Sequence, residues 1–342
     1  MERITLVTGE RKTEVLIGEG IAEKVLAEKT AGRKTFVLAD EIAAERTGFS
    51  FGFSSYRYPY RGGEENKTFR ELGKIIGAAA EAGLHRNDLF LSFGGGVAGD
   101  LGGLAASLYM RGIDHGILPT TLLAMADSSI GGKTAVDFGE YKNLIGTFCQ
   151  PTFVLTDFAF LKTLPEREWL SGAGEIAKTA LLCPSIGKKM KENFALRKDR
   201  GFLLSLVPDC VRFKGEIVSE DEREKTGRRK ILNAGHTVGH MLEMRYREKS
   251  HGEYVLEGLY YENKIAEKIG AIDPSVAKET EEFILSLIGK PTYGHLEKGA
   301  EIAFMDKKNN GNNVSFVAIA GEGKTKEIVL TQKRFGDILV DL

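Results

Sequence analysis

Residues 89–100 of the chain read LFLSFGGGVAGD. The first five form a short apolar run typical of a buried strand, and the glycines after them open an apolar pattern with helical spacing. Gly94, Gly96 and Gly99 satisfy the G-x-G-x-x-G spacing, which lets a backbone approach a pyrophosphate at a helix N-terminus. The same glycines could simply make a tight turn, and no acidic residue follows at the expected distance. The stretch therefore predicts a nucleotide-binding βα unit rather than a standard dinucleotide fold.

Short apolar runs and helical patterns alternate on both sides of this stretch, which is typical of an α/β domain. Residues 4–8 and 14–17 are expected to pair as a hairpin across the turn-like segment that begins at Gly9. Further strands are expected at residues 35–40, 54–58, 89–93, 116–118 and 153–157, and helices at 21–29 and 67–82.

Beyond Leu164 the strand signals nearly vanish, while residues 166–182, 202–220 and 254–269 have helical spacing. We therefore predict an α/β fold class: an N-terminal Rossmann-like nucleotide-binding domain over residues 1–164, followed by an all-α domain over residues 165–342. Clefts between domains are favoured ligand sites, so the chemistry is expected at this junction.

Composition excludes several classes of protein. Of 342 residues 42% are hydrophobic, and the formal net charge of −1 gives no electrostatic case for nucleic acid or an acidic membrane. The first residues contain no apolar signal region, and no run approaches the roughly 18 apolar residues of a membrane span. The three cysteines lack C-x-x-C spacing and are expected to pack in the core. We expect a cytoplasmic protein.

Residues 131–134, Gly-Gly-Lys-Thr, resemble the end of a P-loop. A P-loop requires a glycine five positions before Gly132, and Asp127 stands there, which argues against an ATPase. Lys133 still follows a glycine pair, a favourable place for a lysine that contacts a phosphate.

Residues 233–240 read NAGHTVGH and residues 251–253 read HGE, so three of the six histidines fall within sixteen residues. His236 and His240 would share one face of a helix, and imidazole is a common ligand of zinc-like metals. Thr237 replaces the glutamate of the zincin motif, so a metalloprotease is not expected. The alternative is a histidine pair that packs or caps a helix.

A carboxylate is available to complete such a site. Residues 171–178 read SGAGEIAK and place Glu175 and Lys178 on one helix face, behind small residues that leave room for a ligand. The alternative is a surface ion pair.

Taken together, these segments resemble the dehydroquinate synthase family along nearly the whole chain. The segments that carry the resemblance are residues 94–101, 109–112, 119–124, 127–134, 142–146, 161–168, 174–178, 233–240, 251–253 and 305–308. Their number and order make chance agreement negligible.

The resemblance implies an enzyme that binds NAD and one divalent metal ion, Zn²⁺ or Co²⁺, acts on a small sugar phosphate and forms a homodimer. The implied metal ligands are Glu175, His236 and His251. The implied catalytic and substrate-binding residues are His240, Lys133, Lys178, Asn143, Asp127, Lys214, Arg229, Asn233 and Lys307, with Arg111 reaching in from the partner subunit. The implied NAD contacts are Asp40, Glu64, Lys67, Gly95, Gly96, Gly99, Asp100, Thr120, Thr121, Lys133, Lys142, Phe160 and Thr163.

The implied chemistry is a phosphate-eliminating lyase reaction on a seven-carbon sugar acid. NAD oxidises a ring alcohol, phosphate leaves by β-elimination, the hydride returns, and an aldol closure forms the carbocycle. The chain departs from the family at Glu41 and Ala43, where an Asn is usual nearby, and at Asp137, where the family commonly has Asn. One extra residue also stands near residues 225–228.

Three other functions would require different residues at these positions. Cyclases that make an inosose or a valiolone would be expected to alter Lys214, Arg229 and Asn233, which suit a substrate carboxylate. A polyol dehydrogenase would not need phosphate-binding residues such as Lys133 and Asn143. A scaffold protein that had lost its chemistry would show a broken set of metal ligands.

Overall fold

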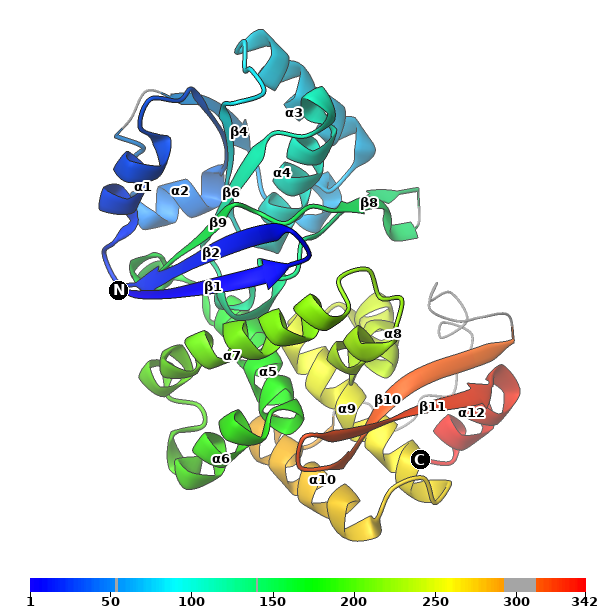
Figure 1. Ribbon diagram of the computed structural model, residues 1–342. Helices are drawn as coiled ribbons and strands as arrows, with labels where there is room; N and C mark the ends of the chain where they lie inside the picture. The colour runs from blue at the N-terminus through cyan, green and yellow to red at the C-terminus, as the bar shows by residue number, and fades with distance from the viewer. Residues whose placement is uncertain (53–54, 140, 292–311) are drawn as a thin grey trace. The chain divides into compact units, whose positions relative to one another are not determined.

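The computed structural model describes residues 1–52, 55–139, 141–291 and 312–342. The chain divides into two compact units, which Figure 1 shows. The first comprises Met1–Trp169 and Val211–Arg223, and the second comprises Leu170–Cys210 and Glu224–Leu342. Within the described residues, no helix is both long enough and apolar enough to span a bilayer.

The first unit is built on a seven-stranded sheet with the order β1-β2-β9-β6-β5-β3-β4. β1 and β2 form the predicted antiparallel hairpin, and the remaining neighbours pair in parallel. The bounds are β1 Glu2–Thr8, β2 Arg11–Gly18, β3 Thr35–Asp40, β4 Ser55–Tyr60, β5 Leu89–Gly94, β6 Asp114–Pro119 and β9 Phe153–Asp157. The predictions for β3 and β9 are correct at both ends, because each is a continuous apolar run buried between layers.

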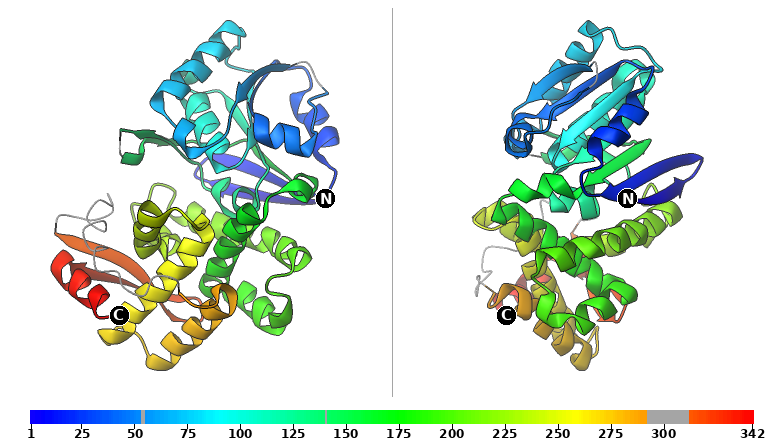
Figure 2. Two further views of the ribbon diagram at one scale, coloured as in Figure 1. Left: turned by 180° about the vertical axis from the view of Figure 1, so that it is seen from behind. Right: turned by 90° about the vertical axis from the view of Figure 1, so that its left-hand side faces the viewer.

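Helices cover this parallel sheet, as Figure 2 shows from two further sides. They are α1 Ala22–Thr30, α2 Glu41–Thr47, α3 Phe69–Glu81 and α4 Gly96–Leu108. α4 follows β5 directly and packs on β5 and β6, and its small residues allow this close approach. The glycine stretch is thus a strand–turn–helix, as its sequence predicts.

A second hairpin in this unit was not predicted. β7 Lys133–Phe138 and β8 Tyr141–Phe148 pair antiparallel, with an irregularity between Val136 and Phe138. β7 packs against α4. β8 is largely exposed, so it lacks the apolar alternation that marks a half-buried strand.

The second unit is mainly helical, which confirms the predicted fold class. Its helices are α5 Glu166–Leu182, which begins four residues before the unit boundary, α6 Pro184–Glu192, the start of α7 Arg200–Glu220, α8 His236–Tyr246, α9 His251–Lys268, α10 Pro274–Ile288 and α12 Gln332–Val340. The bounds of α5 match the prediction, and α7 and α9 begin slightly earlier than expected.

The prediction of an all-α domain is wrong in one respect, because this mainly helical unit also contains a β-hairpin. β10 Asn313–Gly321 pairs antiparallel with β11 Lys324–Thr331. Val314, Phe316 and Ala318 alternate along one face of β10 and join a core formed with residues of α8 and α9. The alternation of apolar residues spans only these three positions, and helical spacing dominates the rest of the region, so the strand was not predicted.

Candidate functional site

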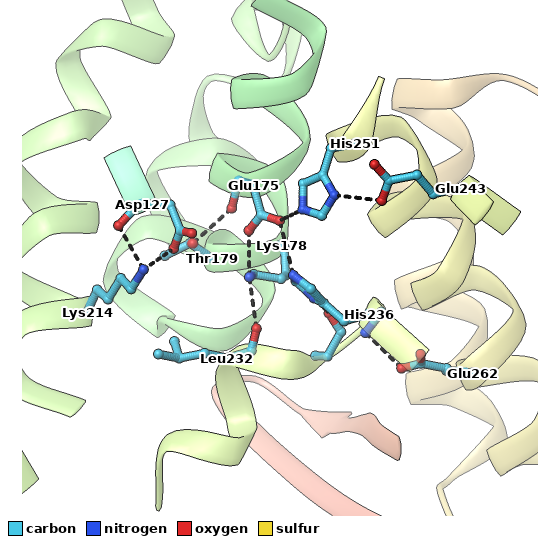
Figure 3. Close-up of polar contacts among 12 residues, drawn as sticks. Asp127, Glu175, Lys178, Thr179, Lys214, Leu232, His236, Glu243, His251 and Glu262 are labelled. Atoms are coloured by element: carbon cyan, nitrogen blue, oxygen red, sulfur yellow. Dashed lines mark hydrogen bonds and ion pairs between the residues drawn. The ribbon is translucent and has the colours of Figure 1, made fainter. Parts of the chain in front are cut away.

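Three predicted metal ligands lie together in the second unit (Figure 3). Glu175 lies in α5, while His236 and His251 are the first residues of α8 and α9. The Oε1 atom of Glu175 is 3.5 Å from Nε2 of His236 and 3.3 Å from Nε2 of His251. Bonds of about 2.1 Å to a tetrahedral metal would place two ligand atoms about 3.4 Å apart. The three side chains therefore fit a divalent metal ion.

Glu175 is a buried carboxylate, with 1% of its side chain exposed. Its Oε2 atom is 2.5 Å from Nζ of Lys178, which also donates a hydrogen bond to the Leu232 carbonyl at 2.9 Å. Burial opposes the charge of Glu175, but Lys178 and His251 outweigh it and lower its pKa to about 2. Glu175 and Lys178 thus form a buried ion pair and not a surface pair, and the carboxylate is ready to bind a cation.

His251 lies between two carboxylates. Its Nε2 faces Glu175, and its Nδ1 is 3.1 Å from Oε2 of Glu243 in α8. Burial opposes a charge on His251, but the two carboxylates outweigh it and raise its pKa to about 10. Sequence reasoning missed Glu243, although it follows His240 by three positions and so shares a helix face with it.

The first turn of α8 is held by a second residue that sequence reasoning missed. The buried carboxylate of Glu262 accepts the backbone N–H of Gly235 at 2.7 Å and of Val238 at 3.0 Å. These are N–H groups that a helix start otherwise leaves without partners. Glu262 lies on α9, so the helix that begins with His251 also fixes the helix that begins with His236.

Glycines bring these two helices into backbone contact. A Cβ atom on Gly258 of α9 would lie 1.9 Å from the carbonyl oxygen of Gly235, and one on Gly239 would lie 2.8 Å from that of Tyr254. Gly235 itself has a backbone φ of +78°, a value that residues other than glycine rarely adopt. The glycines in the NAGHTVGH motif thus set the distance between the histidine-bearing helices.

His240 lies one turn after His236 on α8, and the rings of the two are 5.2 Å apart. Three histidines, His236, His240 and His251, each place one ring nitrogen within 4.8 Å of the other two. His240 is therefore close enough to act on a group bound at Glu175, His236 and His251. The three histidines are also an alternative ligand set.

In the first unit, the glycine stretch forms the start of α4. A Cβ on Gly94 would come within 2.8 Å of Ala98 and Asp40, whereas nothing lies within 4 Å of the Cβ position of Gly99. A small cavity is lined by Gly96, Gly99, Asp100 and Lys133, among others. The predicted phosphate-contacting lysine therefore lies beside the N-terminus of α4, where an anion is favoured.

Other predicted residues meet beside this loop. The Nζ atom of Lys67 lies 2.6 Å from Oδ2 of Asp100 and donates to Oδ1 of Asn143 at 2.6 Å. Lys214 Nζ donates to the Asp127 carbonyl at 2.7 Å and is 3.0 Å from Oδ1 of the same residue (Figure 3). Five residues implied only by the resemblance thus make three polar contacts within this unit.

Asp40, a predicted NAD contact, also has a structural role. Its Oδ1 accepts the N–H groups of Ile42 and Ala43 at 3.0 and 3.2 Å and so caps α2. Phe160, another predicted NAD contact, is buried in a cluster of rings with Phe49 and Phe93.

The remaining predicted residues are placed individually. Glu64 begins one 3₁₀ helix and Thr163 ends another. Thr120 is buried directly after β6, and Lys142 is exposed on β8. Thr121 follows Thr120, and its Cγ2 would lie 3.2 Å from a Cβ on Gly95. Arg111 has a φ of +66°, Arg229 is buried, and Asn233 ends the 3₁₀ helix Arg228–Asn233. Lys307 lies outside the described residues.

Comparison with known proteins decides the family. The model of the 3-dehydroquinate synthase N-terminal domain matches residues 57–171, and that of the C-terminal domain matches residues 172–309. A 3-dehydroquinate synthase from Alkaliphilus metalliredigens is 36% identical over 99% of this chain and 98% of its own length. The chain belongs to the 3-dehydroquinate synthase family. Both the family models and the relative from Alkaliphilus metalliredigens identify it as an enzyme of that family.

Solved structures show the same fold at lower identity. A 2-deoxy-scyllo-inosose synthase, crystallised with carbaglucose-6-phosphate, NAD⁺ and Co²⁺, matches with a TM-score of 0.84 and 23% identity over 99% of this chain and all of that one. A 2-epi-5-epi-valiolone synthase from Streptomyces hygroscopicus, with NAD⁺ and Zn²⁺ bound, matches with a TM-score of 0.83 and 24% identity over 98% of each chain. The chain therefore shares its fold with these two enzymes.

Proposed function

We propose that the chain is a 3-dehydroquinate synthase, which converts 3-deoxy-D-arabino-heptulosonate 7-phosphate into 3-dehydroquinate and phosphate in the shikimate pathway. The observation that carries the proposal is the position of Glu175 Oε1, 3.3 and 3.5 Å from the Nε2 atoms of His251 and His236, in a chain of this family. Two imidazoles and one carboxylate leave metal positions open for a substrate, as a catalytic site requires.

Residues of both units fit the cofactors that this reaction needs. Glu175, His236 and His251 would hold Zn²⁺ or Co²⁺, and the helix start at Gly95 and Gly96 would hold the pyrophosphate of NAD. When bound, NAD would take a hydride from the substrate and return it, and the metal ion would polarise the oxygen of the alcohol involved. Bound NAD⁺ with Co²⁺ or Zn²⁺ in the two solved cyclases supports this assignment.

The chain's own polar residues would bind and orient the substrate. Lys133 and Asn143 would contact the phosphate, and the charge of Lys133 would stabilise the anion as it leaves. Lys214, Arg229 and Asn233 would bind the carboxylate, for which a cationic fork is well suited. Lys178 Nζ, held by Glu175 and the Leu232 carbonyl, would donate to a substrate oxygen.

His240 and Arg111 complete the proposed assignments. The ring of His240 is 5.2 Å from that of His236, and its nitrogen would exchange a proton with a substrate hydroxyl. Arg111 would act across a homodimer and reach the site of the partner subunit. Light scattering of the purified protein would give the mass of a dimer, and a monomer with full activity would contradict this role.

A second candidate is a cyclase with a carboxylate-free substrate, because two such enzymes share the fold. The chain is more similar in sequence to a 3-dehydroquinate synthase, at 36% against 23 and 24% identity. It also retains Lys214, Arg229 and Asn233, which a carboxylate would need. These observations favour the first proposal.

The test is incubation of the purified protein with the seven-carbon phosphorylated keto acid, NAD and zinc. We expect equimolar phosphate and 3-dehydroquinate, no net NADH, and loss of both products when a chelator is added. No turnover of this substrate, together with phosphate release from a carboxylate-free hexose or heptose phosphate, would overturn the proposal in favour of the other cyclases.

A further inference from the structure

Asp137 connects Asn143, which the proposed function places at the substrate phosphate, with Lys67, an NAD contact implied by the resemblance. It lies in β7, where the pairing with β8 becomes irregular. Its Oδ1 atom accepts the backbone N–H of Asn143 at 2.6 Å, and its own N–H donates to the Lys67 carbonyl at 2.8 Å. Asp137 therefore links the β7–β8 hairpin to Lys67 by one hydrogen bond and fixes the backbone of Asn143 by another.

The backbone of Asn143 needs such support. Its φ is +51°, in the left-handed region that is unfavourable for most residues and that asparagine tolerates better than most. The backbone conformation sets the direction in which the side chain leaves the strand. Loss of the hydrogen bond to Asp137 would let this residue relax and would move its amide group.

Lys67 fixes the orientation of the same amide. Lys67 is 4% exposed, and its Nζ donates to Asn143 Oδ1 at 2.6 Å while it pairs with Asp100 at 2.6 Å. Burial opposes the charge of Lys67, but Asp100, Glu64 and Asp137 outweigh it and raise its pKa, so Lys67 remains a donor. Because Oδ1 accepts from a cation, the groups that Asn143 offers to a ligand are its Nδ2 hydrogens.

We propose that Asp137 is a positioning residue: with Lys67 it holds Asn143 so that the amide N–H groups of Asn143 donate to an oxygen of the substrate. This inference rests on the proposed function. The Asn143 N–H needs only the Oδ1 acceptor, which aspartate and asparagine share, so we expect the acceptor and not the charge of Asp137 to be required.

The test compares Asp137→Asn, Asp137→Ala and the wild type by steady-state phosphate release. Asp137→Ala should raise KM for the sugar phosphate roughly 10-fold or more, the order expected for loss of one well-placed hydrogen bond to a charged group. Asp137→Asn should restore KM to within about 3-fold of the wild type, because its amide oxygen accepts the same N–H.

Thr147→Val is the matched control in the same hairpin. It removes the hydroxyl contact of Thr147 with Thr134 at 3.0 Å and leaves Asp137 and Asn143 unchanged. We expect a lower melting temperature and an unchanged KM. A melting temperature lowered in Asp137→Ala with wild-type KM would show a purely structural role and overturn the proposal. Equal defects in Asp137→Asn and Asp137→Ala would overturn it too, because the charge would then be the requirement.

Hydrogen exchange of the backbone N–H of Asn143 gives a readout that needs no turnover. Exchange should be faster in Asp137→Ala than in the wild type and nearly unchanged in Asp137→Asn. An inactive wild type would overturn the proposed function, and the exchange rates would still decide whether Asp137 holds Asn143. Equal exchange in all three proteins would overturn the positioning role.

Discussion

The Nε2 atom of His251 lies 3.3 Å from the Oε1 atom of Glu175, a separation that suits two ligands of one metal ion. In the metal-free protein this contact is an ion pair, since the pKa of His251 is raised to about 10 and that of Glu175 is lowered to about 2. A metal ion and the proton of His251 therefore compete for the same carboxylate and imidazole.

Removal of the carboxylate should abolish this site. We expect Glu175→Ala to weaken zinc binding by more than roughly 100-fold, beyond the loss seen for residues that only support a ligand. Competition with a chelating dye measures this affinity without any turnover. Glu192→Ala, which changes an exposed carboxylate on α6, should bind zinc like the wild type. Tight one-to-one zinc binding by Glu175→Ala would show that the three histidines hold the metal alone.

Glu243 should act on metal binding through His251. Its Oε2 lies 3.1 Å from Nδ1 of His251 and would fix the tautomer that leaves Nε2 available to a metal. We expect Glu243→Ala to weaken zinc binding roughly 10- to 100-fold, and Glu243→Gln to weaken it less, because the amide oxygen still accepts the N–H. Equal zinc affinity in all three proteins, measured by dye competition, would argue against this role.

The ion pair also predicts how the stability of the metal-free protein depends on pH. The pKa of His251 is raised from 6.5 to about 10, so the folded state binds the proton more tightly than the unfolded state. This stabilisation is complete below pH 6.5 and is lost as the pH rises toward 10. Lys178 and His251 together lower the pKa of Glu175 from 4.5 to about 2, so its contribution is complete above pH 4.5 and does not change in this range.

Urea unfolding of chelator-treated protein at several pH values between 6 and 10 would measure this effect. The unfolding free energy of the wild type should fall with pH more steeply than that of His251→Gln, which cannot carry the charge. Parallel curves for the two proteins would mean that the pair contributes no pH dependence.

The contact between α8 and α9 predicts a large effect for one methyl group. Gly258→Ala would place a Cβ 1.9 Å from the Gly235 carbonyl oxygen, so the helices must separate. We expect a loss of about 1–3 kcal/mol in unfolding free energy, as for other overpacked interiors, together with weaker zinc binding. Gly73→Ala is the control: Gly73 lies in α3 with nothing within 4 Å of its Cβ position, and the change should stabilise by about 0.5–1 kcal/mol. Similar behaviour of the two variants would contradict the close helix contact.

Local patterns in the sequence account for much of the fold. The apolar runs of β3 and β9, the turn after β5 and the full length of α5 follow from periodicity and glycine chemistry within each segment. The hairpin β7–β8 escaped prediction because β8 is largely exposed, and the hairpin β10–β11 because helical spacing dominates the part of the chain around it.

Local sequence shows which chemical groups are available: a carboxylate behind small residues, a histidine pair one helical turn apart, and a glycine-rich helix start. Which of these groups meet depends on the packing of the helices. Glu175 reaches His236 and His251 because glycines bring two pairs of helices into backbone contact: α5 and α9 at Gly174 and Gly252, and α8 and α9 at Gly235 and Gly258. Glu243 and Glu262 then support the two histidine-bearing helices. Contacts between residues so far apart in the chain depend on helix packing, which no local spacing encodes.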